Sequence, residues 1–145
     1  MRISTKGRYA LRMMIDIAEH GKDGRVTIKD ISERQGISVK YLEQIVPNLK
    51  RSGLLRSERG SSGGYTLAKE PCQYTAGEIL RVIEGRLAPV ACLEDEINQC
   101  SRKNICKTLG FWEGLYKVID DYIDSVTLQD FMDSKEAGDA GDCSI

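Results

Sequence analysis

The stretch "TIKDISERQGISVKYLEQIVPNLKRSG", residues 27–53, decides the fold of this chain. It contains two helix-forming runs, opened by Thr27 and by Ser38, whose hydroxyl groups are suited to capping a helix N-terminus. Gly36 stands between the runs and supplies a tight turn. The second run places apolar side chains at three- and four-residue steps, at Leu42, Ile45, Val46 and Leu49. A short helix, a glycine turn and a second helix together predict a helix-turn-helix.

Two further features concern the helices around this turn. Upstream, Ser4 or Thr5 can cap a longer amphipathic helix that ends at Gly21. Within the second helix of the pair, Pro47 removes one backbone hydrogen bond. We therefore expect that helix to bend or to be irregular near residues 43–47.

The segment "LLRSERGSSGGYTLAK", residues 54–69, follows the helix pair directly. It contains two short β-prone runs, 54–57 and 65–67, joined by a turn rich in glycine and serine. Cations flank the turn at Arg56, Arg59 and Lys69. An ordinary surface hairpin would look similar, but the preceding helix pair favours the wing of a winged helix.

The C-terminal half predicts two further helices around a cysteine-rich segment. Thr75 and Glu78 have the spacing of a capping box, which opens a helix that continues through Ile83. Beyond the cysteines, apolar residues recur at helical steps, at Leu109, Trp112, Leu115, Tyr116, Ile119, Tyr122, Ile123 and Val126. Such a face covers either the protein's own core or a second copy of the chain. Because a complete winged helix leaves little core to cover, we expect a homodimer formed through residues 108–126.

These elements predict a mainly α fold with a small β-wing, in which a winged helix-turn-helix precedes a long C-terminal dimerisation helix. We expect a winged helix-turn-helix DNA-binding domain in residues 1–70 and a connecting helix with the cysteine loop in 71–107. The dimerisation helix is expected in 108–132. The acidic, small-residue tail 133–145 is expected to be disordered.

Charge is divided unevenly along the chain. Residues 1–69 carry 14 Lys and Arg against 7 Asp and Glu, whereas residues 70–145 carry 7 against 15. The basic half therefore suits contact with a polyanion, and with the helix-turn-helix it predicts a double-stranded DNA operator as partner.

Other features bear on location and on catalysis. No apolar run approaches the roughly 20 residues of a membrane span, and the N-terminus is polar where a signal peptide needs an apolar stretch. We expect a cytoplasmic protein with no membrane partner. The sequence has one histidine, no Ser–His–Asp set and no phosphate loop, so we do not expect an enzyme.

Four motifs then occur in one order along the chain: "MRISTKGRYALRMMIDIAEH" (1–20), "YLEQIVPNLKRSGLL" (41–55), "RGSSGGYTLAK" (59–69) and "GEILRVIEG" (77–85). In these motifs the chain resembles the family of winged-helix regulators that includes the iron–sulfur repressor IscR, the nitric-oxide sensor NsrR and the cysteine-metabolism repressor CymR. The resemblance is strongest to IscR-like members. It implies a dimeric DNA-binding transcription regulator. It does not by itself imply a bound cluster, since CymR lacks the cysteines.

The second helix of the pair is expected to lie in the major groove. Gln44 can pair with adenine, Glu43 can accept from cytosine and Lys40 can donate to guanine. The resemblance places Glu43, Gln44 and Arg59 at sequence-reading positions, although IscR has serine where this chain has Lys40. Arg59 is suited to the minor groove. Phosphate contacts or close backbone approach are expected from Ser38, Tyr41, Ser61, Ser62, Gly63 and Gly64.

The segment "CLEDEINQCSRKNIC", residues 92–106, holds three of the five cysteines, with gaps of seven and five residues. Their polar neighbours argue against a packing role, and neither gap fits the short cysteine pairs of structural zinc sites. Iron–sulfur clusters accept thiolates at varied spacings. We therefore predict Cys92, Cys100 and Cys106 as ligands of an iron–sulfur cluster, with the 2Fe–2S type favoured over 4Fe–4S.

The resemblance does not supply a fourth ligand. IscR has a histidine three residues after its third cysteine, where this chain has Leu109, and NsrR uses an aspartate at the position of Arg8. The open candidates are an exogenous ligand or one of Glu94, Asp95, Glu96, Cys72 and Cys143.

The sequence thus predicts a homodimeric transcription regulator that senses cluster status, oxygen or nitric oxide and controls iron–sulfur cluster biogenesis genes. One alternative is a cluster-free regulator of the same fold, acting as a thiol switch or in cysteine metabolism. A second alternative, an iron–sulfur electron carrier, is disfavoured by the basic helix-turn-helix and wing.

Overall fold

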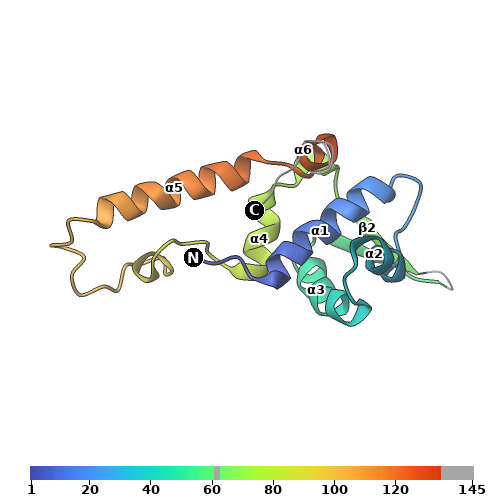
Figure 1. Ribbon diagram of the computed structural model, residues 1–145, viewed down its shortest axis with the longest axis horizontal. Coiled ribbons are helices and arrows are strands. Elements are labelled where there is room, and N and C mark those ends of the chain that lie inside the picture. Colours follow the sequence, from blue (N-terminus) through green and yellow to red (C-terminus); the bar gives the residue numbers. More distant parts are fainter. Residues whose placement is uncertain (61–62, 135–145) are drawn as a thin grey trace.

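The computed structural model describes residues 1–60 and 63–134, and it places a winged helix at one end of a long helical arm (Figure 1). The elements in chain order are α1 (Thr5–His20), α2 (Ile28–Gln35), α3 (Val39–Arg51), β1 (Leu55–Glu58), β2 (Gly64–Leu67), η1 (Pro71–Gln73), α4 (Ala76–Glu84), η2 (Ala91–Leu93), α5 (Leu109–Ser125) and α6 (Leu128–Asp133). The predicted fold class, mainly helical with a two-stranded wing, is confirmed. Within the described ranges, no helix is both long and apolar enough to cross a membrane.

Helix starts follow the predicted caps. A hydroxyl oxygen accepts a hydrogen bond from the N–H three residues on, at 3.0 to 3.1 Å, at Ser4, Thr27, Ser38 and Thr75. Gly36 ends α2 in the left-handed region, at φ 65°. The capping box predicted at Thr75 is only half formed, because the Glu78 carboxylate binds Lys69 Nζ at 2.9 and 3.0 Å.

α3 differs from the sequence-based expectation. The helix runs without a break from Val39 to Arg51 through Pro47, so of the two alternatives expected near residues 43–47, a bend or an irregular segment, the irregular segment is not present. A proline at this position leaves the carbonyl four residues earlier, on Glu43, without its helical donor. Both Glu43 and Pro47 lie on the exposed side of α3, where water can satisfy that carbonyl.

One hydrophobic core joins the two ends of the chain. Fully buried side chains come from α1, α2, α3, α4 and α6, and they include Met13, Ile17, Ile31, Leu42, Leu49, Ile79 and Leu128. α4 and α6 both pack against α1. We call α1 to α4, the wing and α6 the head of the molecule, and the packing of residues 1–70 therefore continues into residues beyond 70.

Tyr74 ties the wing to this core. Its side chain is fully buried, and its hydroxyl donates to the Leu54 carbonyl at 2.7 Å. The same oxygen accepts from the N–H groups of Ala68 at 2.8 Å and Lys69 at 3.2 Å. One side chain thus satisfies three backbone groups where the chain enters and leaves the hairpin.

The wing is an antiparallel hairpin with register from Leu55 opposite Leu67 to Glu58 opposite Gly64. Its second strand also pairs with the α1–α2 connection, through mutual hydrogen bonds of 2.8 and 3.0 Å between Val26 and Tyr65. A Cβ on Gly64 would lie 2.8 Å from the Val26 carbonyl oxygen. Glycine at 64 is therefore required by this close pairing within the head itself.

The arm consists of the cysteine loop, residues 85–108, and α5. α5 has no buried residue, and Figure 1 shows it extending away from the head, with the loop running out alongside it from α4 and turning back into its far end. At its base, the Ala76 N–H donates to Val126 at 2.8 Å and the Leu128 N–H donates to Tyr74 at 3.1 Å. Further along, Arg81 on α4 binds two carboxylates of α5, on Asp120 and Asp124.

Candidate nucleic-acid interface and cysteine loop

α3 turns a polar stripe, Lys40, Glu43 and Gln44, away from the core. All three side chains are exposed, whereas Leu42 and Ile45 on the opposite side are fully buried. Amphipathic periodicity thus fixes which side of α3 faces a partner. The three predicted base-reading residues lie together on one surface, one helical turn apart.

The start of α3 is anchored to α1 by aromatic packing. Ser38 is exposed and caps the helix, while Tyr41 is half-buried with its ring edge-on to Tyr9, 5.2 Å between centroids. Arg12 lies over the other ring of the pair, 5.3 Å from the centroid of Tyr9. The predicted phosphate-binding residues Ser38 and Tyr41 are therefore adjacent to the polar stripe.

A buried ion pair fixes α2 against α1. Asp16 is fully buried; its two carboxylate oxygens share the single N–H of Arg34 Nε at 3.2 and 3.0 Å, and one of them accepts from Arg34 Nη2 at 2.7 Å. Gln35 donates a further hydrogen bond to it at 2.9 Å. The hydrogen bonds to Asp16 raise the pKa of Arg34. Sequence reasoning missed this network, although a carboxylate within the apolar stripe of α1 is the signal that could have found it.

The wing carries the remaining predicted contacts. Arg59 is exposed just beyond β1, and Gly60 adopts φ 135°, which favours glycine. The Gly63 N–H donates to the Gly60 carbonyl at 3.1 Å, and the return strand β2 begins at the next residue, Gly64. Ser61 and Ser62, predicted to contact phosphate, lie outside the described residues.

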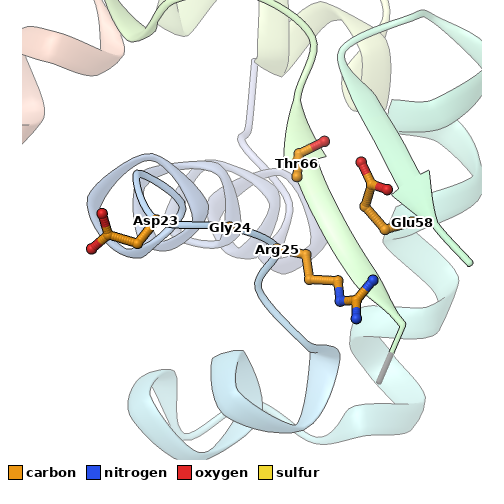
Figure 2. A pocket seen from close by; sticks show the side chains of 5 residues that line it. All are labelled: Asp23, Gly24, Arg25, Glu58 and Thr66. Atoms are coloured by element: carbon orange, nitrogen blue, oxygen red, sulfur yellow. The ribbon is translucent and has the colours of Figure 1, made fainter. Parts of the chain in front are cut away.

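An open hollow of about 520 Å³ lies beside the wing, lined by Asp23, Gly24, Arg25, Glu58 and Thr66. Figure 2 shows Asp23 pointing away from Glu58 and Thr66, while Arg25 extends beside the strand. Opposite charges at its rim and the lack of convergence among its side chains give this hollow none of the features of a small-molecule site.

The cysteine loop carries three half-exposed thiols, on Cys92, Cys100 and Cys106. Asn98 holds part of the loop, since its side-chain oxygen accepts from the Cys100 N–H at 2.8 Å. Cys106 stands just before α5, and the Thr108 hydroxyl 3.3 Å from its Sγ lowers the pKa of the thiol by hydrogen bonding.

The three thiols supply the chemistry of an iron–sulfur ligand set without its geometry in this conformation. Among the described residues, no group of three His, Cys, Asp or Glu side chains is close enough to hold a metal ion. Cys72 lies in η1, which packs against α6 in the head, whereas the three loop cysteines belong to the arm. Cys143 lies outside the described part of the chain.

A winged helix that turns one polar helix face to solvent defines a class of DNA-binding regulators. Residues 3–134 match the model of the Rrf2 family, described as an iron-dependent transcriptional regulator, and the chain belongs to that family. It is 42% identical over 139 residues to a helix-turn-helix type transcriptional regulator of Neisseria meningitidis serogroup A, covering 96% of this chain and 93% of the relative. It is 37% identical over 142 residues to IscR of Pectobacterium carotovorum, covering 98% and 85%.

Two solved structures extend the comparison. CymR, the global cysteine regulator of Bacillus subtilis, matches with a TM-score of 0.77 and 39% identity, covering 94% of this chain and 99% of CymR. IscR of T. potens matches with a TM-score of 0.75 and 37% identity, covering 100% and 94%. The resemblance stated from the sequence is confirmed, and the chain is an Rrf2-family transcription regulator related to both IscR and CymR.

Proposed function

We propose that this regulator reads double-stranded DNA through the polar stripe of α3 and through the wing. The observation that carries the proposal is the common exposure of Lys40, Glu43 and Gln44 on the side of α3 opposite the core. Gln44 pairs with adenine, Glu43 accepts from cytosine, and Lys40 donates to guanine. Arg59 enters the minor groove. The backbone is held by Ser38, Tyr41, Ser61, Ser62, Gly63 and Gly64.

Base reading and phosphate binding are separable by experiment. An operator is first selected by the protein from a pool of randomised duplexes. Gln44→Ala is expected to lose roughly tenfold or more in affinity for that operator and little for a duplex of mixed sequence, because one bidentate base contact contributes about 1–3 kcal/mol. Glu113→Ala, on the exposed surface of α5, is the control. Equal losses on both duplexes would contradict the assignment of Gln44 as a base reader.

A second part of the proposal is a homodimer formed through residues 108–126. Four large apolar side chains of α5 are exposed, by 66%, 37%, 65% and 68%, at Phe111, Leu115, Val118 and Tyr122. Their steps of four, three and four residues form one continuous seam. A second copy of α5 supplies a matching seam, and the resulting dimer presents two recognition helices to successive major-groove turns.

The oligomeric state tests this seam directly. Val118→Asp places a charge in the middle of the seam and is expected to give a monomer in analytical ultracentrifugation, with the helix content of the head retained. Lys117→Gln, one position away and exposed, should leave the dimer intact. A Val118→Asp protein that sediments like the wild type would exclude the seam as the interface.

The third part concerns the cysteine loop, for which we propose an iron–sulfur cluster on Cys92, Cys100 and Cys106, of the 2Fe–2S type. The regulator would then follow cluster status, oxygen or nitric oxide and act on cluster-biogenesis genes. Three thiols on one loop and the iron-dependent description of the family support this reading. The thiols must come together for it, because they do not converge in the conformation described here.

A thiol switch is the second candidate, favoured by one specific observation. Hydrogen bonding from Thr108 lowers the pKa of Cys106, which increases the thiolate fraction that reacts with oxidants. Iron and acid-labile sulfide, measured per monomer after purification without oxygen, separate the two candidates. Matched iron and sulfide that are lost in Cys100→Ser support a cluster. A colourless protein that cannot be reconstituted, and whose thiols pair on oxidation, supports the switch.

A further inference from the structure

A groove of about 440 Å³ lies between the C-terminal half of α3 and the wing. Its lining comes from two elements and is formed by Glu43, Val46, Pro47, Lys50, Arg51 and Tyr65. Val46 is buried and Tyr65 half-buried, so the floor is apolar, whereas Pro47, Lys50 and Arg51 stand exposed around it. The groove therefore combines a hydrophobic floor with a cationic rim.

The position of the groove follows from the length of α3. The helix has 13 residues and is about 20 Å long, whereas the major groove of B-DNA is about 12 Å wide and 8.5 Å deep. With the N-terminal stripe of α3 at base edges and the helix axis inclined across the groove, the last turns of the helix emerge at the phosphate ridge. Lys50 and Arg51 lie in those turns.

The wing approaches the same ridge from its other side. Tyr65 belongs to β2, and the exposed Arg59 lies near the other end of the hairpin turn. A wing directed to the minor groove and a helix directed to the major groove have one sugar–phosphate strand between them. The groove occupies the space between helix and wing.

We propose that this groove seats that strand, with Lys50 binding a phosphate and with Pro47 and Tyr65 packing on the adjacent deoxyribose. The inference rests on the proposed DNA-binding function and names a contact beyond the predicted reading residues. Arg51 donates to the Pro47 carbonyl at 3.3 Å and to the Asn48 side chain at 2.6 Å, which holds its guanidinium against α3. The Lys50 ammonium makes no side-chain hydrogen bond to the described residues, so it is the cation proposed for the phosphate. Glu43 at one end of the groove repels phosphate and directs the strand towards Lys50.

The salt dependence of DNA binding distinguishes the phosphate contact of Lys50 from the apolar contact of Pro47. Binding to a labelled duplex of mixed sequence, about 30 base pairs or three helical turns long, is measured by fluorescence anisotropy between about 50 and 200 mM salt. For Lys50→Gln, the slope of log affinity against log salt is expected to fall by about 0.9 for each bound copy, with affinity roughly eightfold weaker per copy near 0.1 M salt. For Pro47→Gln, affinity is expected to fall a few-fold at every salt concentration with the slope unchanged, because an apolar contact releases no counterion.

Lys117→Gln on α5 removes the same charge far from the groove and should match the wild type. Pro47→Gln improves the helix propensity of α3, and unchanged circular dichroism of each variant shows that the fold is retained. A Lys50→Gln slope equal to that of wild type, or shared with Lys117→Gln, would overturn the phosphate contact. A Pro47→Gln protein with wild-type affinity would overturn the packing of Pro47 on the deoxyribose. Wild-type protein that binds no duplex at any salt concentration would instead reject the proposed function.

Discussion

α1 and α5 have nearly the same length, 16 and 17 residues, and both are amphipathic. α1 buries seven residues in the core of the head, whereas α5 buries none. The half-buried side of α5 packs against α4, and its other apolar stripe is exposed. Two helices with the same kind of sequence pattern thus have different environments within one chain.

The difference shows what holds each region in place. Burial of apolar surface, at about 25 cal/mol per Å², stabilises the head from within a single chain. The arm is attached to the head by the packing of the half-buried side of α5 against α4, by backbone hydrogen bonds at its base and by the ion pairs of Arg81. Ion pairs on a surface contribute little, about 0–1 kcal/mol each. The orientation of the arm is therefore less strongly determined than the packing of the head. A change in the cysteine loop would have to pass through the arm to affect the head.

The largest expected effect on the free energy of unfolding comes from truncating an apolar side chain of the head, and the same kind of truncation in the arm serves as the comparison. Ile79→Ala removes a fully buried side chain of the head and should lower the free energy of unfolding by about 2–4 kcal/mol. Val118→Ala removes a side chain that is 65% exposed and should cost less than about 0.5 kcal/mol in dilute protein. Urea denaturation followed by circular dichroism measures both.

Protein concentration sharpens this contrast. If a second copy covers the seam, the cost of Val118→Ala rises with concentration because association stabilises the folded chain, while that of Ile79→Ala changes little. Equal costs for the two variants in dilute solution would show that the arm is covered by its own chain.

The second prediction concerns the buried charge of the head. Asp16→Asn leaves Arg34 facing an amide, and losing a partner from a buried pair costs about 3–5 kcal/mol. Since the Arg34 side chain is 33% exposed, water offsets part of this loss, and we expect about 2–3 kcal/mol by urea denaturation. Glu33→Gln, an exposed neighbour on α2, should be nearly neutral. A loss below about 0.5 kcal/mol for Asp16→Asn would mean that the network does not hold α2 in place.

The third prediction removes a single oxygen. Tyr74→Phe keeps the buried ring but leaves the Leu54 carbonyl and the N–H groups of Ala68 and Lys69 without their partner. Unsatisfied buried backbone groups cost about 1–3 kcal/mol. Hydrogen exchange should accelerate at Ala68 and Lys69 more than in α1. Uniform acceleration throughout the head would indicate general destabilisation and not a local tie between wing and core.

The sequence predicted local structure better than the contacts between distant residues. The caps at Ser4, Thr27 and Ser38 depend on neighbours three residues away, and periodicity identified the helices that they open. The ties between Tyr74 and Leu54, or between Arg81 and Asp124, join residues 20 and 43 positions apart. No local pattern reports such a contact, because it exists only after the elements have packed.

The predicted site residues also fall into a part that local sequence pattern determines and a part that it does not. Helical spacing alone brought Lys40, Glu43 and Gln44 together on α3, because residues of one helix share a face whatever surrounds them. The cysteines lie on a loop with little regular structure, where spacing does not determine how three thiols meet. Their grouping thus could not be derived from the sequence, and they remain apart in the described conformation.

The smallest effect tests what fixes the arm. Arg81→Gln removes the guanidinium that binds Asp120 at 3.0 Å and Asp124 at 2.7 Å. Because Arg81 is about one-third exposed, we expect a loss near 1 kcal/mol at low salt, decreasing as salt screens the pair. A loss of that size corresponds to about fivefold faster amide hydrogen exchange at Ala76 and Leu128. The N–H groups of these two residues form the backbone hydrogen bonds at the base of the arm.

The pH dependence of this loss has a definite sign. Hydrogen bonding to Asp124 raises the pKa of Arg81, so its stabilisation is fully present below the pKa of a free arginine and is lost only as the pH rises above that value. Titration of Arg81 therefore contributes no change between about pH 6 and pH 9, whereas added salt weakens the arm. Lys117→Gln breaks an exposed pair within α5 alone and should leave exchange at the base unaltered. If Arg81→Gln leaves it unaltered too, the backbone hydrogen bonds and the packing of α5 against α4 hold the arm, and the ion pairs contribute nothing measurable to its attachment.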